Sequence, residues 1–186
     1  MCEKKELELY VHIPFCVRKC AYCDFLSAPA DTQERTLYID ALTEEIRARK
    51  NDFNAYRVST IFLGGGTPSI LEGDDSARIF RALQENFDIS DDAEITMEVN
   101  PGTVTEEKAT SWRKSGVNRL SIGLQSADDR ELKMLGRIHN YREFLDTWKI
   151  VREAGFENVN VDLISAIPGQ NLRSWSETLR KVAYLG

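Results

Sequence analysis

Three cysteines lie close enough in the sequence to hold one metal group together. Cys16, Cys20 and Cys23 form a C-x3-C-x2-C pattern directly after an apolar segment, residues 7–13, that is predicted to be a strand. Three thiolates on one short loop can wrap one corner of an iron–sulfur cube, which leaves one iron without a protein ligand and open to a small molecule. Structural zinc, which usually takes four nitrogen or sulfur ligands, and incidental clustering are the alternatives.

The composition indicates a compartment in which these thiols stay reduced. The chain has 186 residues, 42% of them hydrophobic, and carries 24 Lys and Arg against 30 Asp and Glu, a net charge of −6. No basic tract alternates with aromatic residues, so nucleic acid is not expected as a partner. No apolar run approaches the ~20 residues of a membrane span, and the charged residues 1–6 are unlike a secretory signal. We therefore expect a cytoplasmic protein, in which clustered cysteines more often bind metals or catalyse than form disulfides.

Apolar segments of strand length alternate with amphipathic segments of helix length along the whole chain. Strands are predicted at residues 7–13, 58–63, 94–99, 119–123 and 159–164. Helices are predicted at 34–50, 76–87, 105–116, 129–135, 142–154 and 174–185, the first with an apolar stripe of Leu37, Ala41, Leu42 and Ile46. This alternation is typical of parallel βαβ units in an α/β fold, either a partial or complete (β/α) barrel of the TIM type or a doubly wound sheet. No linker or low-complexity segment divides residues 1–186, so one domain is expected.

Glycine and polar residues stand where the predicted strands end. Residues 64–66 are glycines followed by Thr67; glycine lets a backbone approach a ligand closely, although such a run can also be only a turn. Glu98 ends the third strand, where it is either a solvated carboxylate or part of a site, because barrel enzymes build sites at the carboxyl ends of their strands. Asp162 lies inside an apolar strand, where an unpaired carboxylate is costly, so it should have a defined partner or face the barrel mouth.

The segment that carries the cysteines also carries a family resemblance. It reads Tyr10-Val-His-Ile-Pro-Phe-Cys16-Val-Arg-Lys-Cys20-Ala-Tyr22-Cys23 and resembles the radical S-adenosylmethionine (SAM) superfamily. It is most similar to the branch of oxygen-independent coproporphyrinogen III oxidases and HemW-type heme chaperones, and the likeness covers essentially all 186 residues. The resemblance implies a partial TIM-type barrel with parallel strands. It also implies that residues 1–186 are an incomplete radical SAM core domain, which stops after about five βα units and before the family's C-terminal region.

The same resemblance implies cofactors, partners and site residues. A [4Fe–4S] cluster would be bound by Cys16, Cys20 and Cys23, with the methionine amine and carboxylate of SAM on its open iron. Heme or a porphyrin would be a further ligand, with unidentified heme-acceptor proteins as partners and a homodimer left open. Tyr10, near SAM in the family, is otherwise expected to be a packed core tyrosine. Cofactor contacts are implied for Tyr10, Tyr22, Gly65, Gly66, Thr67, Glu98, Gln125, Arg137 and Asp162.

Phe25 separates two functions within this branch. The decarboxylating oxidases carry a further cysteine two residues beyond the third, and Phe25 stands at that position here. A phenyl ring offers neither a thiol nor a hydrogen bond, so the resemblance favours a heme chaperone that binds the cluster, SAM and heme for transfer to acceptor proteins. The alternative is an oxygen-independent coproporphyrinogen III oxidase that decarboxylates propionates through SAM-derived radicals. No residue is assigned a catalytic role.

Overall fold

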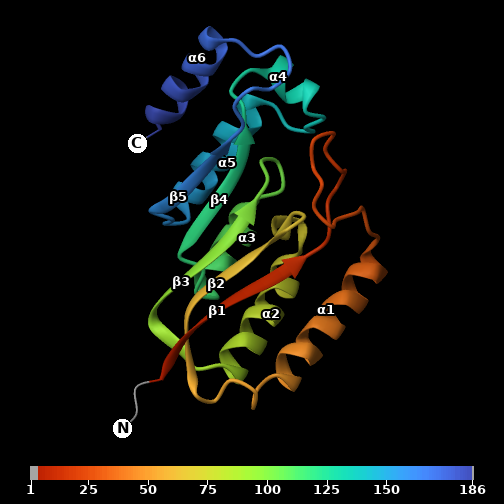
Figure 1. The fold of residues 1–186 in the computed structure, drawn as a ribbon, viewed down its shortest axis with the longest axis vertical. Helices are drawn as coiled ribbons and strands as arrows, with labels where there is room; N and C mark the ends of the chain where they lie inside the picture. The colour runs from red at the N-terminus through yellow and green to blue at the C-terminus, as the bar shows by residue number, and fades with distance from the viewer. Residues whose placement is uncertain (1–3, 186) are drawn as a thin grey trace.

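Five parallel strands form one sheet at the centre of the protein. The computed structural model describes residues 4–185, and Figure 1 shows the strands side by side. They are β1 (Lys5–Ile13), β2 (Tyr56–Gly65), β3 (Ile89–Val99), β4 (Arg119–Gln125) and β5 (Asn158–Leu163). Each pairs in parallel with its neighbours, in the order β1-β2-β3-β4-β5.

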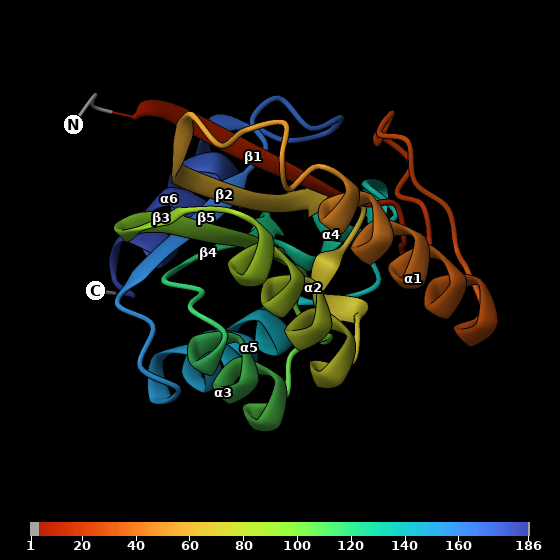
Figure 2. The ribbon, with the colours of Figure 1, turned by 90° about the horizontal axis from the view of Figure 1, so that it is seen from below.

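The strand order distinguishes the two folds that the sequence allowed. In a doubly wound sheet the order reverses at a switch point, whereas here each strand lies beside its neighbour in the sequence. Figure 2 shows α1 (Thr32–Ala48), α2 (Gly73–Asn86), α3 (Glu106–Lys114) and α5 (Tyr141–Glu153) on one side of the sheet, like part of the outer ring of a barrel. The fold is therefore a partial (β/α) barrel of the TIM type, as predicted.

Three further helices connect or follow the strands. A 3-10 helix, η1 (Pro68–Ile70), follows β2, α4 (Asp129–Met134) follows β4, and α6 (Leu172–Ala183) follows β5. The helix α6 contacts the segment after β4, where its Thr178 hydroxyl accepts a hydrogen bond from the Ala127 N–H at 3.2 Å. Among the described residues 4–185, no helix has both the length and the apolar character needed to cross a membrane.

Side-chain caps fix where several helices begin. Before α1, the Asp31 carboxylate accepts the Glu34 N–H at 2.8 Å, and the Glu34 carboxylate accepts the Asp31 N–H at 2.9 Å. Asn140 and Glu143 form the same reciprocal pair at the start of α5, and Thr105 caps α3 as predicted. These caps satisfy backbone donors that have no partner within the helix. They also fix the connections between the helices and the strand ends.

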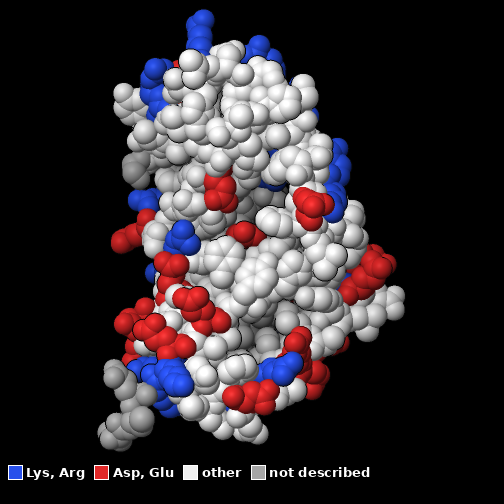
Figure 3. All heavy atoms as spheres, viewed as in Figure 1, with Lys and Arg blue, Asp and Glu red and all other residues white. Residues whose placement is uncertain are grey.

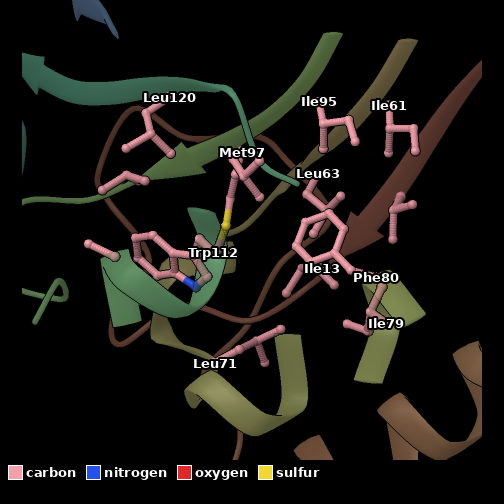
Figure 4. Close-up of a cluster of buried hydrophobic side chains, with 14 of the residues drawn as sticks. Ile13, Ile61, Leu63, Leu71, Ile79, Phe80, Ile95, Met97, Trp112 and Leu120 are labelled. Atoms are coloured by element: carbon pink, nitrogen blue, oxygen red, sulfur yellow. The ribbon is translucent and has the colours of Figure 1, made fainter. Parts of the chain in front are cut away.

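The hydrophobic core lies between the sheet and the helices that cover it. Figure 4 shows Ile13, Leu63 and Met97 of three neighbouring strands with Phe80 of α2 and Trp112 of α3, and each of these side chains is at most 2% exposed. Successive strand residues point to opposite faces of a sheet. Burial of these side chains therefore turns the alternate residues of each strand toward the interior of the barrel.

The interior face of the sheet carries polar and aromatic side chains. Tyr10, Phe62, Thr96 and Arg119 stand in register across β1 to β4, and Arg119 Nη1 donates to the Thr96 hydroxyl at 3.2 Å. Figure 3 views the protein from this side. Acidic side chains gather at the lower end of the face, while its middle is mostly uncharged. The interior is therefore lined for contact with water or a polar ligand rather than for a second apolar core.

The apolar stripe predicted for the first helix was partly wrong. Leu37 and Ala41 are exposed, whereas Ile39 and Thr43 are buried. The Thr43 hydroxyl donates to a backbone carbonyl of its own helix at 2.9 Å, so this polar side chain can be buried without an unpaired group. The buried face is therefore set by packing against the sheet and α2, which a count of apolar residues did not reveal.

Two elements begin at least three residues earlier than predicted. The helix α2 starts at Gly73 rather than at residue 76, and its first turn contains Asp74 and Asp75, which favour the positive end of the helix dipole. The strand β3 starts at Ile89 rather than at residue 94, because Ile89 pairs with Val58 of β2. The polar residues 90–92 between Ile89 and the apolar part of the strand concealed this start.

Candidate functional site

The three cysteines lie on the loop between β1 and α1. The Cys16 N–H donates to the Ala28 carbonyl at 3.1 Å, which folds the loop back on itself. The Ala21 N–H donates to the Leu135 carbonyl, just after α4, at 3.0 Å. Figure 1 shows the two segments side by side despite their separation in the sequence. All three thiols are free and partly exposed, so the loop is fixed while its sulfur atoms stay accessible.

The donor set decides which metal group these cysteines fit. Within residues 4–185, no three His, Cys, Asp or Glu side chains converge on a point that would hold a single metal ion. In a [4Fe–4S] cluster each cysteine binds a different iron, so Cys16, Cys20 and Cys23 need only surround the cluster. Three cysteines leave one iron without a protein ligand. The donor set thus fits a cluster with one open coordination site.

The glycine loop after β2 is held against β1 and the cysteine loop. Gly65 has φ +114°, and a Cβ at this position would lie 2.5 Å from the His12 ring. A Cβ at Gly66 would lie 2.5 Å from the carbonyl oxygen of Phe15, which accepts the Thr67 N–H at 2.7 Å. Both positions require glycine because the neighbouring strand and loop approach so closely. The sequence had explained these glycines by the approach of a ligand or by a turn, not by the approach of another part of the chain.

Glu98 projects from the end of β3 toward the glycine loop. Its Oε2 accepts the Gly65 N–H at 3.0 Å. Burial raises the pKa of the Glu98 carboxyl above its ordinary value, the Gly65 N–H lowers it, and the Asp162 carboxylate adds to the increase. A ligand that brings a positive charge or a hydrogen-bond donor would therefore stabilise the half-buried carboxylate at this position.

The partner expected for Asp162 is present. Its Oδ1 accepts the Ser121 hydroxyl at 2.9 Å and the Asn160 side-chain amide at 2.6 Å. Gln125 ends the neighbouring strand β4 with φ +71°, a conformation that is uncommon for a residue with a side chain. The strand ends of β3, β4 and β5 thus each bring a polar side chain to the same end of the sheet.

Arg137 connects the segment after α4 to the cysteine loop. Its Nη2 donates to Asn100 Oδ1 at 2.7 Å and to the Gly123 carbonyl at 2.8 Å, and its Nη1 donates to Cys20 Sγ at 3.6 Å. Its Nε is buried and has no hydrogen-bond partner among the described residues. A guanidinium can only donate, so this nitrogen leaves one buried donor for a ligand that carries an acceptor.

The two tyrosines differ in their placement. Tyr10 is 59% exposed, so the alternative of a packed core tyrosine is wrong. Its ring stacks on Phe62, and its hydroxyl lies 3.0 Å from Nδ1 of His12. Tyr22 lies beside Cys23 at the pocket described below, where burial raises the pKa of its hydroxyl and the nearby Arg137 guanidinium lowers it. Tyr10 stands on the barrel interior next to the pocket, and Tyr22 lines the pocket itself.

One pocket of about 250 Å³ contains all the predicted contact residues except Tyr10. It lies at the carboxyl ends of the strands, where barrel enzymes carry their sites. The predicted residues that line it are Cys16, Cys20, Cys23, Tyr22, Gly65, Gly66, Thr67, Glu98, Gln125, Arg137 and Asp162. Residues from six different segments of the chain therefore meet in one place.

The sequence reasoning missed several residues of this pocket. Arg18, Lys19, Asn100 and Ser121 also line it. Asn100, directly after the third strand, was not among the predicted contact residues. A polar side chain at the carboxyl end of a strand was the signal, as it was for Glu98.

The pocket has three features that fit a cluster with SAM on its open iron. The cysteines supply thiolate ligands for three irons. The glycine loop brings backbone groups to the pocket wall without side chains at Gly65 and Gly66. Arg137 Nε leaves a buried donor, and Glu98 supplies a half-buried acceptor. Carboxylate and ammonium groups on a ligand would thus both find partners of opposite charge.

Comparison with known proteins places this site in a family. Residues 10–182 match the radical SAM superfamily. The HemW heme chaperones of Haemophilus influenzae and Escherichia coli are 37% and 39% identical to this chain, over 96% of the chain and 48% of each relative. The mitochondrial radical S-adenosyl methionine domain-containing protein 1 of Mus musculus is 37% identical over 95% of the chain and 40% of the relative.

The fold has a close counterpart among solved structures. Coproporphyrinogen III oxidase (HemN) from Escherichia coli, a radical SAM enzyme, superposes with a TM-score of 0.90 at 35% identity, over 98% of this chain and 42% of that chain. This chain spans about half the length of the curated relatives it matches. The family match over residues 10–182 includes both the partial barrel and the cysteine loop, and the chain therefore belongs to the radical SAM superfamily.

Proposed function

We propose that this chain is the cluster-binding part of a heme chaperone of the radical SAM superfamily. In this proposal Cys16, Cys20 and Cys23 bind a [4Fe–4S] cluster, SAM binds beside it, and heme is bound for transfer to acceptor proteins. The similarity to HemW heme chaperones at 37% and 39% identity supports this function. Because the chain spans about half of those relatives, the transfer of heme and its acceptors are proposed for the whole protein.

The cofactor roles follow from the chemistry of the pocket. A [4Fe–4S] cluster held by three cysteines supplies an open iron position and an electron. Glu98 is placed to accept a hydrogen bond from the ligand, and Arg137 is placed to donate one through its unpaired Nε. Gln125 and Asp162 offer further polar groups at the strand ends, and Tyr22 offers an aromatic wall. The glycine loop, with Thr67, would bind the methionine end of SAM.

Phe25 is the observation that supports a chaperone rather than an oxidase. The ring lines the same pocket as the three cysteines and is 63% exposed. Exposure of a phenyl group to water is unfavourable. The free energy therefore falls when a flat apolar ligand covers the ring. A porphyrin macrocycle beside the cluster would cover it. A phenyl ring cannot take the role of the additional cysteine that the resemblance assigns to the oxidases at this position.

The remaining parts of the proposal concern organisation and partners. Residues 1–186 are proposed to be an incomplete radical SAM core domain of a protein that acts in the cytoplasm, where the cysteines stay reduced. Its partners would be heme or a porphyrin and heme-acceptor proteins, without a role for nucleic acid.

The experiment compares heme binding with turnover in the anaerobically reconstituted protein. We expect stoichiometric heme binding, followed by the Soret absorbance, and no protoporphyrinogen from coproporphyrinogen III in the presence of SAM and a reductant. Phe25→Ala should weaken heme binding, while Phe25→Leu, which keeps an apolar side chain, should weaken it less. Phe25→Cys alone should not create turnover, because substrate positioning depends on other residues. Unchanged heme affinity in Phe25→Ala would contradict the placement of heme at this ring.

SAM binding is tested separately by calorimetry on the cluster-loaded protein. Glu98→Ala should weaken SAM binding by roughly 1.5–3 kcal/mol, the contribution of a hydrogen bond to a charged group. Unchanged affinity would refute the placement of SAM beside Glu98.

The second candidate function is the oxidase. The superposition on the solved coproporphyrinogen III oxidase, with a TM-score of 0.90, favours it as a specific observation. Sustained production of protoporphyrinogen by the wild-type protein would overturn the chaperone and leave this function in its place.

A further inference from the structure

Two of the cysteine sulfurs each receive a hydrogen bond from a side chain outside their loop. The Thr67 hydroxyl donates to Cys16 Sγ at 3.6 Å, and Arg137 Nη1 donates to Cys20 Sγ at 3.6 Å. Thr67 follows β2 and Arg137 follows α4, so the two donors come from segments that are far apart in the sequence. Hydrogen bonds to the sulfur ligands help to set the reduction potential of an iron–sulfur cluster.

A single side chain joins these two donors. Asn100, directly after β3, accepts a hydrogen bond from Arg137 Nη2 at its Oδ1, at 2.7 Å. Its Nδ2 donates to the Thr67 hydroxyl oxygen at 2.8 Å. A continuous series of hydrogen bonds therefore runs from one cysteine sulfur to the other, through three segments that are far apart in the sequence, with Asn100 at its centre.

The direction of every bond in this series is fixed by chemistry. A guanidinium has no acceptor, so Arg137 requires the oxygen of the Asn100 amide to face it. The amide nitrogen then faces Thr67 and can only donate to it. Because the Thr67 oxygen accepts this bond, its single hydroxyl hydrogen is free to point at Cys16 Sγ. The identity of Arg137 thus determines that Thr67 donates to the cysteine.

The backbone of Asn100 is itself held in place. Its N–H donates to the hydroxyl of Ser69, which is fully buried, at 3.0 Å. The Thr103 hydroxyl donates to the Asn100 carbonyl at 2.7 Å and lies 2.6 Å from the Ser69 hydroxyl. Hydrogen bonds to both the N–H and the carbonyl of Asn100 therefore fix the position from which its side chain reaches Thr67 and Arg137.

We infer that Asn100 is a positioning residue that aims the Thr67 hydroxyl and the Arg137 guanidinium at Cys16 and Cys20. This inference deepens the proposed function, since it rests on a cluster bound by these cysteines. Donors directed at thiolate ligands stabilise the reduced cluster, which carries the more negative charge, and raise its reduction potential. Asn100 thereby keeps the potential higher than the cysteines alone would give.

The test exploits the requirement that Asn100 both accept and donate. Asn100→Asp keeps the acceptor for Arg137 but replaces the donor to Thr67 with a second acceptor. The Thr67 hydroxyl then donates to the new carboxylate, and its bond to Cys16 is lost. The potential of the reconstituted cluster, measured without SAM by an EPR-monitored redox titration, should fall. The new negative charge lowers the potential as well, so the single variant does not isolate the effect.

A double-mutant cycle with Thr67→Val separates the two contributions. The negative charge that Asn100→Asp adds acts on the cluster with either Thr67 or Val at position 67. The hydroxyl can turn from Cys16 to the new carboxylate only in a protein that has Thr67. Asn100→Asp should lower the ratio of reduced to oxidised cluster at a fixed potential. We expect this decrease to be at least threefold larger in the wild type than in Thr67→Val. For a one-electron couple at 59 mV per tenfold change, this coupling is about 28 mV. Thr67→Ser, which keeps the hydroxyl, should retain the coupling.

Gln125→Glu is the matched control, because it adds a charge to the same pocket without a hydrogen bond to Thr67 in the structure. Its effect should be additive with Thr67→Val. Additive effects of Asn100→Asp and Thr67→Val would overturn the inference while leaving the cluster assignment intact. If a variant holds too little cluster for titration, the rate of iron removal by a chelator is measured instead for the same four proteins, and the two substitutions are again tested for additivity. A wild-type protein that forms no cluster would overturn both the inference and the proposed function.

Discussion

Gly66 is a position at which backbone atoms leave no room for a side chain. A Cβ there would lie 2.5 Å from the Phe15 carbonyl oxygen and 2.9 Å from the carbonyl carbon and the nitrogen of the same residue. All three are backbone atoms, which cannot rotate away as the end of a flexible side chain can. Gly66→Ala must therefore separate the glycine loop from the cysteine loop.

The cost can be worked out from these contacts. Relief of an overpacked site typically costs about 1–3 kcal/mol. The separation also threatens the hydrogen bond from the Thr67 N–H to the Phe15 carbonyl, which contributes about 0.5–1.5 kcal/mol. We therefore expect Gly66→Ala to lower the free energy of unfolding by about 2–4 kcal/mol. Urea denaturation of the cluster-free protein, followed by far-UV circular dichroism, measures this loss.

Gly73→Ala provides the matched control. Gly73 is the first residue of α2, and a Cβ there would meet only the Ser111 side chain, at an ordinary contact distance of 3.6 Å. This variant should keep or slightly raise the stability, by up to about 1 kcal/mol, because alanine restricts the unfolded chain. A Gly66→Ala protein as stable as Gly73→Ala would refute the close approach of the two loops.

Three further predictions concern charge and loop position. Burial raises the pKa of Glu98, so its contribution to stability is present at acidic pH and is lost as pH rises through the folded-state pKa; Glu98→Gln should flatten this pH dependence in urea denaturation. Asp128 caps α4, and its bonds to Arg130 lower its pKa to about 2, so Asp128→Ala should cost about 1 kcal/mol near neutral pH and progressively less as pH falls toward 2. His12 contacts the Leu26 carbonyl at 2.9 Å, so His12→Phe should speed amide hydrogen exchange in residues 25–28.

The sequence predicted those features of the fold that depend on local patterns. Strand segments, the cap at Thr105 and the glycine loop each follow from neighbouring residues, and all are present. The choice between a barrel and a doubly wound sheet depended on strand order, which no local pattern encodes. The buried face of α1 also depended on its neighbours, so the exposed Leu37 was wrongly placed on the apolar stripe.

The candidate site was predictable where a residue type alone indicates chemistry. The cysteines and the strand-end carboxylates met this condition, and the structure gathers them in one pocket. Asn100 did not, because its position between Thr67 and Arg137 arises only when three distant segments meet. The requirement for glycine at position 65 likewise depends on the ring of His12 across the neighbouring strand.

The most direct test of the central claim is the iron and sulfide content of anaerobically reconstituted cysteine variants. Cys16→Ala, Cys20→Ala and Cys23→Ala should each lose the cluster and its broad visible absorbance, because each removes one of three ligands to the same group. Cys2→Ala is the control, since Cys2 precedes the first strand and lies outside the described residues; it should keep the wild-type content. A full cluster in Cys20→Ala, or its loss in Cys2→Ala, would contradict the account.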